Sequence, residues 1–230
     1  MQTIVLAAAK GGVGKTTLVA ALATAACLAS PCLTVAVIDL DPQGSLTLWW
    51  NLRGSHEPHL VSLDGAPLRK VRDALARAGF DLLIVDCPPG FSSTLSGAIQ
   101  AADLVVVPAG ASNMDIEAVA ATVEMAKRVG VPHCCVLNRA PFRSRLAGRA
   151  LTALREFGTR VLPVVHHRVA VAEAMAIGGT ALETQPAGAA ARELTALWNA
   201  VRAELNRPVG RPSRLAAGND RKIVIGMAVR

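Results

Sequence analysis

The chain of 230 residues is 52% hydrophobic but only 3% aromatic, and it carries a formal net charge of +7. This length suits one α/β domain with a well-buried core. The five cysteines form no CxxC pair and have no zinc-ligand spacing with the histidines, so we expect reduced thiols in a cytoplasmic protein. The start of the chain lacks a basic segment before its apolar run, which argues against a signal peptide.

Apolar segments alternate with helix-forming segments along the chain. Strands are predicted at residues 4–8, 33–38, 82–85, 104–107 and 133–137, with a shorter strand-like run at 161–165. Helices are predicted at residues 14–29, 69–78, 116–129, 145–157 and 187–205. The longest apolar stretch, residues 18–33, contains Thr24, Ser30 and Pro31 and indicates a buried helix rather than a membrane span. The alternation predicts a single α/β domain: a doubly wound, mostly parallel sheet with helices on both faces.

The segment after the first predicted strand has the pattern of a phosphate-binding loop. In Gly11-Gly12-Val13-Gly14-Lys15-Thr16, the glycines would let backbone N–H groups point at phosphates at the start of a helix. Lys15 would reach the β- and γ-phosphates of ATP, and the Thr16 hydroxyl would ligate Mg²⁺. The general pattern requires a glycine where this chain has Ala9; a second lysine, Lys10, stands directly before the glycine pair instead.

Three segments together resemble one protein family. The string Lys10-Gly11-Gly12-Val13-Gly14-Lys15-Thr16-Thr17 resembles the deviant Walker A box of the ParA/MinD ATPases. The segments at residues 37–45 and 83–90 resemble two further boxes of that family in order and spacing. The resemblance covers roughly residues 2–205 and is closest to the short ParA-type partition proteins, since there is no room for an amino-terminal helix-turn-helix domain.

The resemblance implies roles for individual residues. Lys10 is similar to the signature lysine that crosses an ATP-sandwich dimer and touches the partner's nucleotide, as an arginine finger does. Asp41 is similar to the residue that orients the attacking water, and Asp86 to the aspartate that holds Mg²⁺ through a water. Asp39 ends a predicted strand at the edge where ligands bind and would support the Mg²⁺ shell or that water. Asn138 is similar to an adenine-contacting asparagine.

Structural roles remain open for several of these residues. Asp39 and Asp41 could cap a helix or form a turn at Asp-Pro, and Asn138 could be a turn residue at a strand end. The catalytic set is therefore predicted as Lys10, Lys15 and Asp41, and the metal set as Thr16, Asp39 and Asp86. The nucleotide-binding set is predicted as Gly11, Gly12, Val13, Gly14, Lys15, Thr16, Thr17 and Asn138.

Positive charge lies in two blocks. From Arg139 to Arg168 there are seven arginines against one acid, and from Arg207 to Arg230 there are six basic residues against one acid. Such asymmetry indicates a polyanionic partner, and the resemblance implies non-specific DNA binding by an ATP-bound dimer. Aromatic residues are few, which argues against base stacking. The candidate DNA contacts are Arg143, Arg145, Arg149, Arg168, Arg192 and Arg202, with a solvated helix face as the alternative for each.

Other members of the wider group make less suitable matches. A MinD-like membrane regulator needs an amphipathic carboxy-terminal helix, and residues 221–230 are basic and apolar but rich in β-branched residues. A redox relative needs cysteines that ligate a metal cluster, and the five cysteines here do not have that arrangement. A related tyrosine kinase needs a tyrosine cluster, and this chain has no tyrosine. A metabolic ligase does not need a lysine at the position of Lys10. Trp49 and Trp50 are expected in core or interface packing, with a partner contact as the alternative.

We therefore expect an ATPase domain at residues 1–206 and a basic, flexible tail at 207–230. The resemblance implies a cytoplasmic, nucleoid-associated ATPase that uses ATP and Mg²⁺, dimerises with ATP and hydrolyses it slowly unless stimulated. It also implies a ParB-like or adaptor activator and a cargo, which could be a plasmid, a chromosome or a protein assembly. The sequence does not distinguish these cargoes.

Overall fold

A seven-stranded sheet forms the centre of the protein. The structure is a computed structural model that describes residues 1–29 and 31–207. Its strands are β1 (Gln2–Leu6), β2 (Val35–Asp39), β3 (His59–Leu60), β4 (Leu82–Asp86), β5 (Leu104–Ala109), β6 (His133–Leu137) and β7 (Arg160–Val161). They lie in the order β3-β2-β4-β1-β5-β6-β7, and every pair is parallel.

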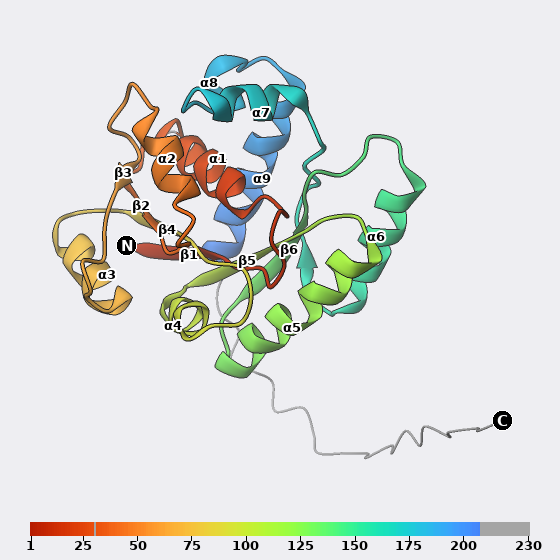
Figure 1. Cartoon of the computed structure of the whole chain (residues 1–230), viewed down its shortest axis with the longest axis horizontal. Coiled ribbons are helices and arrows are strands. Elements are labelled where there is room, and N and C mark those ends of the chain that lie inside the picture. The colour runs from red at the N-terminus through yellow and green to blue at the C-terminus, as the bar shows by residue number, and fades with distance from the viewer. Residues whose placement is uncertain (30, 208–230) are drawn as a thin grey trace.

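Helices cover both faces of this sheet (Figure 1). One face carries α1 (Lys15–Cys27), α2 (Ser45–Asn51), α7 (Val169–Ala176), α8 (Ala181–Thr184) and α9 (Ala189–Leu205). The other face carries α3 (Leu68–Arg77), α4 (Ser93–Ala101), α5 (Asn113–Val129) and α6 (Arg145–Glu156). The doubly wound, parallel fold predicted from the sequence is confirmed.

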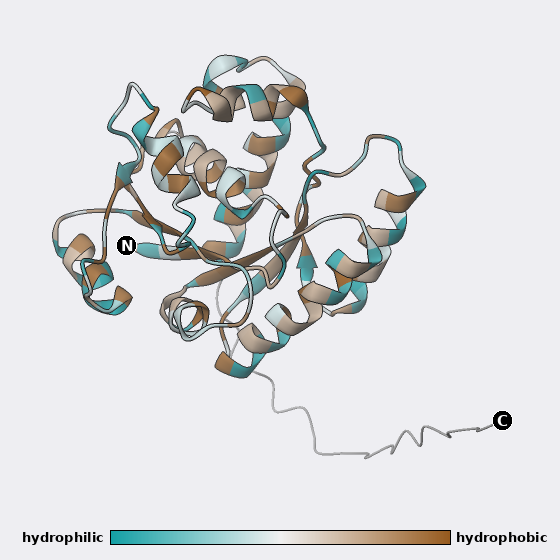
Figure 2. Cartoon of the chain, viewed as in Figure 1, coloured by the Kyte–Doolittle hydropathy of each residue, from teal (hydrophilic) through white to brown (hydrophobic). Residues whose placement is uncertain are grey.

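Each face has its own hydrophobic core. Successive side chains of a strand point to opposite faces, so Ile4 and Leu6 join one core while Val5 joins the other. Both faces are covered, and the central strands are therefore mostly apolar, as Figure 2 shows in brown. Helix α1 has ten buried residues out of 13, which explains the long apolar stretch in the sequence.

The structure corrects several predicted boundaries. The strand predicted at residues 161–165 is only β7, because Pro163 has no N–H to continue the ladder. Four helices and one strand were not predicted: α2, α4, α7, α8 and β3. No helix among the described residues is long and apolar enough to cross a membrane. The predicted tail lies outside the described residues, apart from Arg207.

Candidate nucleotide-binding site

The loop between β1 and α1 has the backbone of an anion-binding cradle. Gly12 and Gly14 adopt positive φ angles of 76° and 87°, and Gly14 directly precedes α1 as its N-cap. A side chain at Gly14 would also overlap the Asn138 amide, so glycine is required here for two reasons. The free N–H groups and positive dipole end of α1 therefore face an open site suited to phosphate.

Lys15, Thr16 and Asp86 meet beneath this loop. Lys15 is only 6% exposed, and the Thr16 hydroxyl donates a hydrogen bond of 2.5 Å to Asp86 Oδ2. Burial raises the pKa of Asp86 to about 7, against the opposing effect of the Thr16 hydrogen bond. Asp86 Oδ1 is buried without a hydrogen-bond partner among the described residues. A hydroxyl beside an unpaired carboxylate oxygen fits Mg²⁺ and its water shell.

The two other aspartates shape the loop after β2. Asp39 lies beside Asp86 in the sheet, and its Oδ1 accepts from the Asp41 backbone N–H at 3.1 Å. Its Oδ2 accepts from the N–H and hydroxyl of Thr47 at 2.9 and 3.1 Å, which ties it to the first turn of α2. Asp41 accepts from the Gln43 N–H at 3.0 Å and lines a cavity beside the phosphate loop. Asp39 thus has the turn-holding role that the sequence left open.

Three cavities adjoin the phosphate loop, and two of them also border α7. The larger, of about 680 Å³, lies between α2 and α7, with Asp41, Leu48 and Trp49 on one wall and Met175 and Ala176 on the other. The smaller, of about 180 Å³, is mostly apolar and lies between α1, α7 and the end of β6. Its lining includes Thr17, Asn138, Arg139, His166 and Met175. A mostly apolar pocket with a few polar groups suits a nucleotide base, whereas the larger cavity suits phosphates.

Asn138 and Arg139 brace the phosphate loop from β6. Asn138 is buried, and its Nδ2 donates to the Val13 carbonyl at 2.8 Å. The Arg139 guanidinium donates to the Gly12 carbonyl at 2.8 Å, and Arg139 lines both cavities. The structure therefore brings Asn138 to the predicted site, with its amide bonded to the loop. Arg139 was missed, and its only signal in the sequence was its place directly after Asn138.

Lys10 is held within its own chain. Its Nζ lies 2.5 Å from Asp115 Oδ1, and the two side chains are 39% and 15% exposed. Asp115 belongs to the capping box of α5 with Ser112. Burial alone would raise the pKa of Asp115, but hydrogen bonds from Lys10 and Ser112 together with the charge of Lys10 hold it below its usual value. Asp115 was also missed, because 105 residues separate it from Lys10.

The six candidate DNA contacts do not form one patch. Arg143, Arg145 and Arg149 are exposed around the start of α6. Arg168 forms an ion pair with Glu193 at 2.6 Å, and Arg192 donates to the Ala187 carbonyl at 2.5 Å. Arg192 and Arg202 belong to α9, which covers the opposite face of the sheet from α6. Of these six, all within the described residues, only the three at α6 are close together and without an acidic partner.

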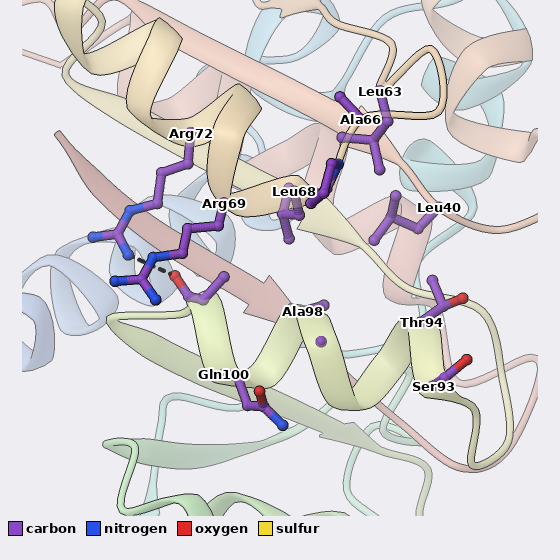
Figure 3. A pocket seen from close by; sticks show the side chains of 13 residues that line it. Leu40, Leu63, Ala66, Leu68, Arg69, Arg72, Ser93, Thr94, Ala98 and Gln100 are labelled. Atoms are coloured by element: carbon purple, nitrogen blue, oxygen red, sulfur yellow. Dashed lines mark hydrogen bonds between the residues drawn. The ribbon is translucent and has the colours of Figure 1, made fainter.

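A separate groove lies between α3 and α4. It has a volume of about 520 Å³, and Leu40, Leu63, Leu68 and Ala98 are among its apolar lining residues. Figure 3 shows Arg72 at one end of this groove. The Arg72 guanidinium donates to the Ala101 carbonyl at 3.0 Å and pairs with Asp103. No residue of the phosphate loop lines the groove, so it is distinct from the nucleotide cavities.

A strand, a glycine-rich loop and a helix, with an aspartate at the end of the neighbouring strand, define a P-loop nucleotide-binding protein. Residues 4–180 match the model of the CobQ/CobB/MinD/ParA nucleotide binding domain. The chain belongs to this family, whose ParA and MinD members are ATPases. The resemblance drawn from the three sequence boxes is thereby confirmed.

Individual relatives are similar over nearly their whole length. The chain is 32% identical to "Maintenance of carboxysome distribution protein A" of Gloeobacter kilaueensis, covering 86% of this chain and 91% of that protein. It is 34% identical to the "Chromosome-partitioning ATPase Soj" of Thermus thermophilus, covering 81% and 89%. The structure of an ATP complex of a Cyanothece McdA variant superposes with a TM-score of 0.70 at 21% identity, covering 89% and 96%.

Proposed function

We propose that this chain is a ParA-type positioning ATPase. It binds Mg·ATP, dimerises in the ATP state, binds DNA non-specifically and positions a cargo until hydrolysis stimulated by a partner releases it. The observation that carries the proposal is the Thr16–Asp86 pair beneath the phosphate loop, next to the buried Lys15. The relatives named for carboxysome distribution and chromosome partitioning support the same class of activity.

The residues of the site have different roles in hydrolysis. Lys15 and the loop N–H groups hold the phosphates, and Thr16 and Asp86 hold Mg²⁺. When bound, Mg²⁺ offsets the charge that develops on the phosphates. Asp41 orients a water whose oxygen attacks the γ-phosphorus, while the bond to the bridging oxygen of ADP breaks. Asp39 acts indirectly, because both of its oxygens are bonded to the loop and to α2.

A second copy of the chain would complete the site. Two large, exposed apolar side chains, Leu48 and Leu52, line the larger cavity, and the exposed Ile177 directly follows its lining residue Ala176. An apolar rim of this kind suits a surface that another protomer covers. In the dimer, each Lys10 would leave Asp115 and bring its charge to the partner's phosphates.

The arginines at the start of α6 support the DNA-binding part of the proposal. Arg143, Arg145 and Arg149 are exposed and have no acidic partner among the described residues. Contacts from arginine to phosphate give non-specific affinity that falls steeply with salt. We accordingly propose a cytoplasmic, nucleoid-associated protein with a ParB-like or adaptor activator. The cargo would be a plasmid, a chromosome or a protein assembly.

Calorimetry and phosphate release together test the nucleotide part of the proposal. ATP is titrated into the wild-type chain with Mg²⁺ and with EDTA, and into Lys15→Ala with Mg²⁺. We expect binding and slow phosphate release by the wild type, weaker binding with EDTA, and neither activity in Lys15→Ala. A folded wild-type chain that neither binds nor hydrolyses ATP would refute the proposal.

A further inference from the structure

A cluster of polar contacts joins α2 to the segment between α7 and α8. The Trp49 indole N–H donates to the Gly179 carbonyl at 2.9 Å, and the Arg53 guanidinium donates to the Gly178 carbonyl at 3.0 Å. Arg53 also forms an ion pair of 2.6 Å with Glu183 in α8. All three contacts span more than 120 residues of sequence, so they fix two distant segments against each other.

Arg53 is the centre of this cluster. Its side chain is only 5% exposed, its guanidinium lies 4.6 Å from the centroid of the Trp49 ring, and its Nε donates to the Glu57 carbonyl at 3.0 Å. The backbones meet equally closely, because a side chain at Gly178 would overlap the backbone of Leu52. A buried, planar guanidinium with partners in several directions holds one geometry and is not a solvated surface charge.

The two segments joined by Arg53 follow closely after the two walls of the larger cavity. Leu48, Trp49 and Leu52 of the α2 wall face the cavity, and Met175 and Ala176 of α7 face it from the other side. Met175 also lines the smaller cavity, where we place the base. The contacts at the end of α2 therefore set how far the α2 wall stands from the wall that the base contacts.

Helix α2 is bonded to the catalytic loop at its other end. Thr47 donates twice to Asp39, and the Gly44 N–H donates to the Asp41 carbonyl at 2.9 Å. A tilt of this seven-residue helix would therefore move the loop that carries Asp41. Displacement of a catalytic group by about 1 Å can cost about a hundredfold in rate.

We propose that Arg53 is a positioning residue for ATP hydrolysis. It fixes α2 against Gly178, Gly179 and Glu183, and so holds Asp41 at the working distance from the phosphate loop. Because α7 lines the base pocket, the same contacts link the base side of the site to the water-orienting loop. This inference rests on the proposed hydrolysis of ATP and adds to it a residue outside the three sequence boxes.

The chain supplies a matched control for Arg53. Arg72 also combines a bond to a backbone carbonyl with an ion pair to one carboxylate, but it lies at the α3–α4 groove and not at a nucleotide cavity. The experiment compares steady-state ATP hydrolysis, and the affinity for a fluorescent ATP analogue, in the wild type, Arg53→Ala and Arg72→Ala. Glu183→Gln is the second variant, since it keeps Arg53 and its bond to Gly178 but removes the ion pair. Thermal unfolding gives the folded fraction of each protein.

The expected result is a loss of turnover without loss of binding. Arg53→Ala should lower kcat about tenfold, with KM and the analogue affinity changed by less than about threefold. Glu183→Gln should give a smaller loss of kcat in the same direction, and Arg72→Ala should resemble the wild type. Equal kcat per folded molecule in all four proteins would overturn the inference and leave the proposed function standing. A wild-type chain that does not hydrolyse ATP would overturn both.

Discussion

Replacement of Asp115 by asparagine should favour the ATP-bound dimer. In the single chain, Asp115 holds Lys10 in an ion pair of 2.5 Å, and our account requires Lys10 to leave that pair when it crosses to a partner. Asparagine is the appropriate change because its carbonyl oxygen can still accept from Ser112 and preserve the cap of α5. The substitution thus removes the charge that retains Lys10 with little loss of helix stability.

The size of the effect follows from the exposure of the pair. The Lys10 side chain is 39% exposed, so solvent screening reduces the ion pair to about 0.5 kcal/mol. A symmetric dimer breaks two such pairs, which is about 1 kcal/mol in total, or about fivefold in the dimer dissociation constant.

Sedimentation equilibrium with a slowly hydrolysed ATP analogue measures that constant. Glu124→Gln is the control, because it removes another carboxylate of α5, one that pairs with Lys127. We expect tighter dimerisation of Asp115→Asn and no change in Glu124→Gln. A dissociation constant for Asp115→Asn that equals or exceeds that of the wild type would refute the idea that Asp115 restrains Lys10.

Three further predictions concern the carboxylates Asp86 and Glu183. Asp86→Asn should lower the Mg²⁺-dependent part of ATP affinity, measured by calorimetry, at least about tenfold. The same variant should melt no lower than the wild type in EDTA at about pH 8. Burial raises the pKa of Asp86 from 3.8 to about 7, so stability is lost as pH rises between these values and the full cost of ionisation is present at about pH 8. A lower melting temperature would contradict this. Burial alone would also raise the pKa of Glu183, but Arg53 and Thr180 hold it below the usual 4.5. The ionised Glu183 carboxylate therefore stabilises the folded state above pH 4.5, and this stabilisation is lost as pH falls through the lowered pKa. Denaturant titrations at about pH 6 and about pH 3.5 measure the unfolding free energy. Glu183→Gln should lose less of it on acidification than the wild type does. Equal losses in the two proteins would argue against the stabilising role of ionised Glu183.

The sheet and the phosphate loop could be predicted because their signals are local. The apolar runs around Ile84 and Val106 are buried on both faces, and such runs indicate parallel strands without knowledge of their neighbours. Gly12, Gly14, Lys15 and Thr16 are adjacent in sequence, so the loop was found from the residue pattern alone.

The missing elements lacked such local signals. Helix α2 has seven residues and follows Gly44, whose φ angle of 64° gives it a conformation typical of helix ends rather than starts. Helix α4 follows two prolines and a glycine, which indicate a loop, and only Ser92, whose hydroxyl accepts from the Leu95 N–H, marks its start. Both helices depend on packing against the sheet more than on their own composition.

Long-range contacts of the site could not be predicted at all. Lys10 and Asp115 are ordinary residues in their own segments, and so are Arg53 and Glu183. Their pairing depends on the crossover connections of the sheet, which bring the ends of distant helices to one edge. The sequence therefore yielded candidate nucleotide-binding residues, but not the residues that hold them in place.

Co-sedimentation with non-specific duplex DNA tests the central claim most directly. The wild type is compared with ATP, ADP and no nucleotide across a salt series, with Lys10→Ala and liposomes in parallel. We predict binding to DNA only with ATP, a steep fall with salt, and no binding by Lys10→Ala. Binding to liposomes without binding to DNA would contradict the account and make the arginines around α6 a solvated surface.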